Sequence, residues 1–105
     1  HEFTLASKLY AELKAIKGIT VVGQDFSSEK RTPTVSFTVK GKTAEEVCRQ
    51  LAAENICAWD GHFYAVRAIE VLGLLEKGGV TRMGISLYNT EQEIDYVIKA
   101  VKKLI

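Results

Sequence analysis

Hydrophobic residues recur at helical spacing in three long segments of the chain. Within residues 4–16 they stand four, four and three positions apart, which places them on one helical face, and Gly18 then supplies a stop. Second and third helices are predicted over residues 43–55 and 90–105. Both begin with a threonine, Thr43 or Thr90, three residues ahead of a glutamate, which is the capping-box pattern. A shorter helix is predicted over residues 62–72.

Alternating or β-branched runs predict four strands. Residues 19–22 form a β-branched run, and residues 34–39 alternate valine and phenylalanine with serine and threonine. A brief apolar run at residues 56–59, followed by an Asp-Gly turn pair, predicts a third strand. The fourth covers residues 79–87 and carries Arg82 on one face, with Met83 and Ile85 on the other.

This order of elements predicts an α+β fold. We expect a two-layer sandwich in which a mixed sheet of about four strands buries one face under the three longer helices. The other face is expected to be partly open and to carry Ser36, Thr38, Arg82 and Ser86. A composition of 47% hydrophobic and 26% charged residues is typical of one small globular domain, here residues 1–105.

Charge and hydropathy exclude several classes of partner. The chain has 14 basic and 13 acidic residues, which alternate along it and give a formal net charge of +1. It therefore lacks the basic block typical of nucleic-acid binding. No apolar run approaches the ~20 residues of a membrane span, and the first residues are polar rather than those of an export signal. We expect no nucleic-acid partner, no membrane association and a cytoplasmic location.

Cysteines and histidines are too sparse for a metal site. Cys48 and Cys57 stand nine residues apart, which is neither a metal-ligand spacing nor a dense disulfide framework. Both are expected to be small buried hydrophobic residues. His62 is the only histidine besides the terminal His1, so no metal site is predicted.

Arg82 is the candidate binding residue. A guanidinium flanked on its strand face by Gly84 and Ser86 has room beside it for a planar anion, and its fork of donors matches a carboxylate bidentately. A solvated arginine or a structural ion pair, for instance with a carboxylate of the last helix, is the alternative that this pattern leaves open.

Five segments of the chain, taken together and in this order, are similar to segments of a known enzyme family. They are GITVVG at residues 18–23, RTPTVSF at 31–37, GHFYA at 61–65, TRMG at 81–84 and YNT at 88–90. Through them the chain resembles, nearly end to end, the carboxy-terminal small domain of class V aminotransferase-fold enzymes. This pyridoxal-phosphate group includes cysteine desulfurases and selenocysteine lyases.

The resemblance implies a substrate-binding role for Arg82. It matches the arginine that binds the α-carboxylate of an amino-acid-type substrate in that family. Tyr88, Asn89 and Thr90 match the turn that follows the arginine strand.

The resemblance also implies an active-site loop, formed by Gly61, His62, Phe63 and Tyr64. Desulfurases read Gly-His-His-Cys-Ala there, and the cysteine takes up sulfur. Phe63 and Tyr64 replace the second histidine and the cysteine, so the nucleophilic thiol is missing from its expected place. An exposed aromatic patch is expected near Trp59, Phe63 and Tyr64.

The family's catalytic lysine and cofactor-binding groups lie in a preceding large domain, which the resemblance implies this chain lacks. Its own lysines fall on predicted helix surfaces or turns. We therefore expect the parent protein to be a pyridoxal-phosphate-dependent transferase or lyase. It would be a homodimer whose large domain contacts this one, and the isolated chain would neither bind the cofactor nor catalyse the reaction. The alternative is a complete, non-catalytic α+β module that binds an amino acid or a protein through its open sheet face.

Overall fold

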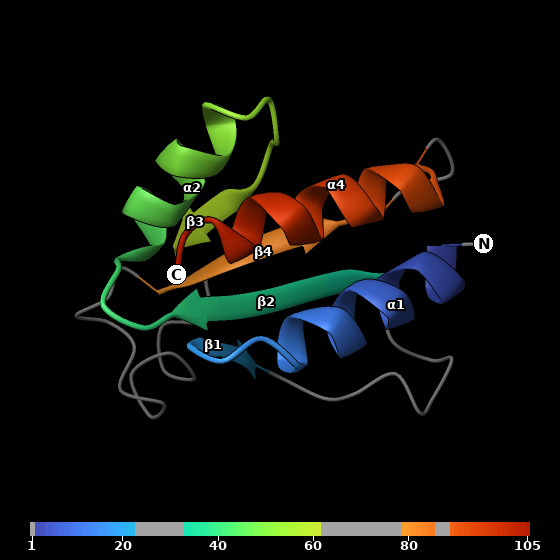
Figure 1. The fold of residues 1–105 in the computed structure, drawn as a ribbon, viewed down its shortest axis with the longest axis horizontal. Helices are drawn as coiled ribbons and strands as arrows, with labels where there is room; N and C mark the ends of the chain where they lie inside the picture. The colour runs from blue at the N-terminus through green and yellow to red at the C-terminus, as the bar shows by residue number, and fades with distance from the viewer. Residues whose placement is uncertain (1, 23–32, 62–78, 86–88) are drawn as a thin grey trace.

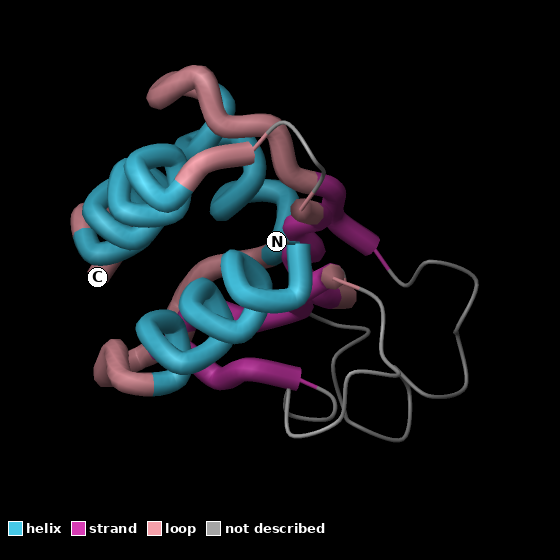
Figure 2. The backbone as a smooth tube through the Cα atoms, turned by 90° about the vertical axis from the view of Figure 1, so that its right-hand side faces the viewer, coloured by secondary structure: helices cyan, strands magenta, loops and turns pink. Residues whose placement is uncertain are grey.

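The computed structural model describes residues 2–22, 33–61, 79–85 and 89–105. Its elements are α1 (Glu2–Lys14), β1 (Ile19–Val22), β2 (Thr34–Val39), α2 (Ala44–Ala52), β3 (Trp59–Gly61), β4 (Val80–Gly84) and α4 (Glu91–Lys102) (Figure 1). Figure 2 shows the helices together on one side of the strands. The predicted α+β two-layer sandwich is thus confirmed, while the short helix predicted over residues 62–72 lies outside the described residues.

The strands form one four-stranded sheet in the order β1-β2-β4-β3. Each pairing is antiparallel, whereas a mixed sheet was expected. β2 and β3 do run in the same direction, as expected for strands joined through a helix, but β4 lies between them. The sheet therefore contains no parallel pair among the described strands.

The core fills the space between the helices and the sheet. On β2, alternate residues Val35, Phe37 and Val39 are almost completely buried, because the period of two turns them toward the helices. α1 and α4 lie side by side over this face. The helices contribute apolar residues at helical spacing, namely Leu5, Leu9 and Leu13 from α1, Val47 and Leu51 from α2, and Ile94, Ile98 and Val101 from α4.

Local capping chemistry starts two of the helices. Thr43 Oγ1 accepts from the backbone N–H of Glu46 at 3.2 Å, and Glu46 Oε1 accepts from the backbone N–H of Thr43 at 2.9 Å. Thr90 and Glu93 form the same reciprocal pair at the same distances. Both predicted capping boxes are confirmed, and each satisfies two backbone donors that the helix itself leaves without partners.

The third strand was predicted in the wrong place. Ile56 belongs to the exit of α2, since its N–H donates to the Leu51 carbonyl at 3.0 Å, and Asn55 before it has a φ of 62°. A residue in the left-handed conformation followed by a buried hydrophobic residue is a common helix ending. The strand begins only at Trp59 and includes Asp60 and Gly61, because these residues pair with β4.

Candidate functional site

The sheet face away from the helices is hydroxyl-rich and carries one charge among its described strand residues. We call it the open face and define it by its residues that are not fully buried, Thr20, Val22, Thr34, Ser36, Thr38, Trp59, Arg82 and Gly84. Val80 and its partner Gly61 lie on the same side, where Val80 is 4% exposed. Strand pairing places them on one side of the sheet. Arg82 is the only charged member of this set, and the predicted Ser36, Thr38 and Arg82 are all in it. Ser86 lies outside the described residues.

β4 separates the two faces residue by residue. Thr81 and Met83 are buried on the helix side at 1% and 5% exposure, whereas Arg82 and Gly84 are exposed on the open face. α4 covers the opposite side of the sheet (Figure 2). A buried ion pair with a carboxylate of α4 therefore does not explain the presence of Arg82 on this strand.

Arg82 has very different neighbours on its two sides. Ser36 of β2 is directly opposite it on one side, and Trp59 of β3 is directly opposite it on the other. Directly paired residues on one face have Cβ atoms about 4.5–5.5 Å apart. A small hydroxyl and a large indole thus flank the guanidinium.

The predicted active-site loop leaves the sheet close to this row. Gly61 ends β3 and pairs with Val80, two residues along β4 from Arg82, or about 7 Å. Gly79, directly before β4, has a φ of +86°, and a Cβ atom at this position would overlap the Gly61 carbonyl. The backbones thus approach so closely that a side chain at Gly79 has no room. His62, Phe63 and Tyr64 lie outside the described residues.

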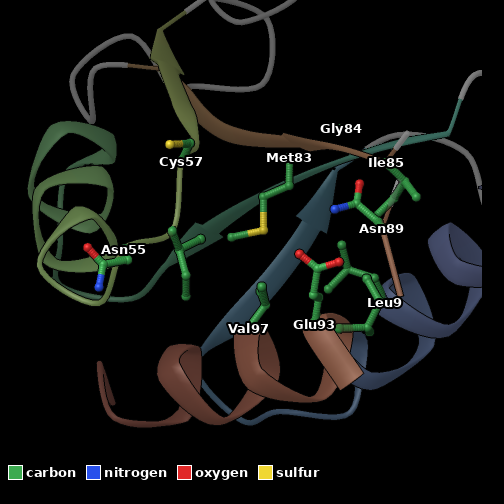
Figure 3. Close-up of a pocket in the computed structure, with 11 residues that line it drawn as sticks. Leu9, Asn55, Cys57, Met83, Gly84, Ile85, Asn89, Glu93 and Val97 are labelled. Atoms are coloured by element: carbon green, nitrogen blue, oxygen red, sulfur yellow. The ribbon is translucent and has the colours of Figure 1, made fainter. Parts of the chain in front are cut away.

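The described part of the predicted turn lies on the helix side instead. Thr90 is the N-cap of α4. Asn89 lines a pocket of about 360 Å³ between α4 and the sheet, together with Met83, Glu93 and Val97 (Figure 3). The carboxylate of Glu93 already accepts the Thr90 backbone N–H. The structure therefore brings Arg82 and Gly61 near each other but leaves Asn89 and Thr90 in the other layer, and Tyr88 is not among the described residues.

The two cysteines are less buried than expected. Cys57 is exposed and Cys48 is half-buried, because Cys57 lies between α2 and the edge strand β3 rather than inside a strand. Burial raises the pKa of the Cys48 thiol, the nearby Thr81 hydroxyl opposes this shift, and Asp60 adds to it. Thr81 Oγ1 is itself buried and makes no hydrogen bond of good geometry, so we regard its contact with the thiol as a weak one.

The described lysines do not fit a Schiff-base site. None of them is buried, whereas an imine-forming lysine needs a lowered pKa, commonly through burial. Lys8 is the opposite case, because hydrogen bonds to Asp95 at 2.7 Å and Glu91 at 3.0 Å raise its pKa to about 12. No pyridoxal-phosphate site can be built from the described residues.

In the part of the chain that the structure describes, no three His, Cys, Asp or Glu side chains gather in a way that could hold a metal ion. No described helix is both long and apolar enough to cross a membrane.

Reasoning from the sequence did not find the pairing of Trp59 with Arg82. It placed the third strand over residues 56–59, which ends at Trp59 and gives no register with β4. Trp59 is 74% exposed. The aromatic patch expected around it stays a prediction, because Phe63 and Tyr64 lie outside the described residues. Only the strand pairing reveals the neighbour of Trp59, since no local signal in the sequence encodes it.

Comparison with known proteins identifies relatives along the whole chain. An aminotransferase-like protein of Gibberella zeae is 35% identical over 100% of this chain. A probable cysteine desulfurase of Mycolicibacterium paratuberculosis is 30% identical over 99% of it. The apo structure of a cysteine desulfurase from Thermococcus onnurineus shares the fold, with a TM-score of 0.88 at 23% identity over 99% of the chain.

These relatives are much longer than this chain. The chain spans 27% of the Gibberella protein, 14% of the Mycolicibacterium protein and 25% of the Thermococcus structure. The family model for aminotransferase class-V matches residues 1–97. The chain therefore belongs to the class-V aminotransferase family.

Proposed function

We propose that this chain is the small domain of a pyridoxal-phosphate-dependent enzyme of the cysteine desulfurase type, and that Arg82 binds the α-carboxylate of its amino-acid substrate. The observation that carries the proposal is the position of Arg82. It is exposed on the face opposite the helices and is the only charged residue among the described strand residues of the open face. A guanidinium in that setting offers two parallel donors to a carboxylate.

The groups that bind the cofactor and carry out the reaction would belong to other parts of a longer parent protein. The described lysines do not fit the cofactor, and the relatives are several times longer than this chain. A large domain of the same polypeptide would therefore supply the Schiff-base lysine and the phosphate site. The segment from Gly61 to Tyr64 would form the rim of the active site, with Tyr88 to Thr90 as the turn after the arginine strand. The parent would be a cytoplasmic homodimer.

The proposal concerns substrate binding rather than sulfur transfer. Cys48 and Cys57 are the only cysteines of the chain, and neither belongs to the open face or to the proposed rim. A persulfide step therefore has no evident thiol in this domain. Carboxylate recognition is common to transferases and lyases that act on amino acids.

Replacement of Arg82 in the parent enzyme tests the proposal. Arg82→Ala removes a charge-assisted contact of about 1.5–3 kcal/mol, so kcat/KM for amino-acid substrates should fall about 10- to 150-fold. Arg82→Lys should recover part of this loss, because it restores the charge but not the fork.

Arg49→Ala is the matched control. Arg49 is also exposed, but it lies on α2 and pairs with Glu45, so its loss should leave kcat/KM unchanged. An Arg82→Ala enzyme with wild-type kcat/KM, or an equal fall in both variants, would contradict the proposed role.

A further inference from the structure

Trp59 is the second unusual residue of the open face. It is the only tryptophan of the chain, it lies on the edge strand β3, and 74% of it is exposed. Tryptophan usually buries most of its large apolar surface. An indole this exposed is unusual for tryptophan, and here it is paired with Arg82, the only charged residue among the described strand residues of the open face.

The position of Trp59 relative to Arg82 specifies what it could contact. The two residues are direct cross-strand partners on the same face, with Cβ atoms about 4.5–5.5 Å apart. A carboxylate held by the guanidinium fork fixes the first atoms of a ligand. The next few carbon atoms then lie within reach of the indole, because aromatic contacts form at centroid distances of about 4.5–7 Å.

The two directions away from Arg82 differ in chemistry. Toward β2, a ligand would meet Ser36 and the neighbouring hydroxyls of Thr34 and Thr38, all half-buried. Toward β3, it would meet the indole of Trp59. The described open face offers no second cation for an acidic side chain. Trp59 is the only apolar side chain paired directly with Arg82, which favours it as the contact for the apolar part of a ligand.

We infer that Trp59 determines substrate specificity beside the carboxylate site: it contacts the side chain of a substrate whose carboxylate binds Arg82. The substrate class is a monocarboxylic amino acid with an aromatic or extended apolar side chain, rather than a small polar or an acidic one. This inference rests on the proposed function of Arg82 and adds that Trp59 contacts the side chain of the substrate.

The test is a titration of the 105-residue chain with three probes. 3-Phenylpropanoate carries both groups, propanoate lacks the ring, and 3-phenylpropanol lacks the charge. Because Trp59 is the only tryptophan, its fluorescence reports directly on ring contact. The NMR signals of the Arg82 Nε–H and the Trp59 indole N–H report separately on the two halves of the site.

3-Phenylpropanoate should shift both NMR signals, change the fluorescence of Trp59 and bind about 3- to 10-fold more tightly than propanoate. Trp59→Ser should abolish this advantage without changing propanoate binding. Arg82→Ala should weaken 3-phenylpropanoate to the level of the alcohol and should abolish propanoate binding. Both variants change exposed side chains, and a wild-type circular dichroism spectrum establishes that each is folded.

Four results overturn the inference, and they differ in what else they affect. If the advantage of the ring survives in Trp59→Ser, or if 3-phenylpropanoate shifts the signal of Arg82 but not that of Trp59, the specificity role is wrong while carboxylate binding stands. If the alcohol binds as tightly as 3-phenylpropanoate, Trp59 is a general apolar surface. If no carboxylate shifts Arg82, the proposed function fails together with the inference.

Discussion

The covered face and the open face of the sheet are built from the same four strands, but different requirements fix their residues. On β2, Phe37 is completely buried and fills the space under the helices, while its neighbour Ser36 is only half-buried on the other side. The covered face must match the volume of the helices packed on it. The open face has no such constraint from the described helices, so its residues can be chosen for binding.

The contrast is sharpest on β4, where the side changes with every residue from Thr81 to Gly84. A polar residue on the covered face, such as Thr81, carries an energetic cost because its buried oxygen lacks a good partner. A charged residue on the open face carries little such cost. Arg82 therefore indicates function more strongly than a buried polar residue of the same strand does.

Truncation of Phe37 should break the covered face and produce the largest effect. Phe37→Ala leaves a cavity where a fully buried ring was, which should lower the free energy of unfolding by about 3–5 kcal/mol. Ser36→Ala and Arg82→Ala, on the open face, should each lower it much less, because neither removes a buried apolar side chain. Urea unfolding of the three variants measures the difference. A large loss for Arg82→Ala would mean that the arginine stabilises the fold rather than binding a substrate.

The close approach of Gly61 and Gly79 should give the next largest effect. Gly79→Ala adds a methyl group that overlaps the Gly61 carbonyl at a φ of +86°. Gly41→Ala is the control, because Gly41 has a similar φ of +80° but nothing within 4 Å of a Cβ. The backbone conformation should cost about 1–2 kcal/mol in both variants, and the overlap should add about 1–3 kcal/mol at Gly79 alone. Equal thermal stabilities would show that β3 moves aside freely.

Loss of a helix cap should have the smallest of these effects and should leave both faces intact. Thr43→Ala removes the N-cap hydroxyl of α2 and should lower the free energy of unfolding by about 0.5–2 kcal/mol, whereas Thr43→Ser should retain most of it. Denaturant unfolding at pH 7 measures both variants.

The cap should also depend on pH through Glu46. Hydrogen bonds from the Thr43 backbone and side chain lower the pKa of Glu46 below its ordinary value of 4.5. Its stabilising contribution is therefore present above that ordinary pKa and is lost as the pH falls through the lowered one. The difference in stability between wild type and Glu46→Gln should shrink as the pH falls below about 4.5. A difference that stays constant with pH would exclude the ionised cap.

Much of the fold could be predicted because its signals are local. The caps at Thr43 and Thr90 depend on residues three positions apart, and the alternation of β2 marks its buried face within six residues. The boundaries of β1 and β2 coincide with the predicted ones. α1 runs over Glu2–Lys14 rather than residues 4–16, a shift that fraying and the first-turn preference for Glu2 explain.

The remaining features depend on contacts between distant segments. The predicted position of β3 was wrong for two reasons. Ile56 packs at the end of α2, and Asp60 belongs to the sheet because it pairs with Thr81 of β4. Cys57 was expected to be buried because the strand predicted over residues 56–59 included it. For the candidate site, the outward direction of Arg82 followed from alternation alone, but its neighbours Ser36 and Trp59 required the order of strands. The sequence of a single strand does not determine which residues of a neighbouring strand it pairs with.

The meeting of Gly61 and Gly79 has an evolutionary consequence. Both ends of the stretch 62–78 are fixed at one point of the sheet by the β3–β4 pairing. Lengthening a loop between fixed ends has a small entropic cost, about 0.6 kcal/mol for each doubling. Insertions, deletions or wholesale exchange in this stretch would therefore leave Trp59 in register with Arg82. With the proposed roles of Arg82 and Trp59, a protein built on this plan could change its reaction while keeping the residues that recognise its substrate, and the two properties could be inherited and altered separately.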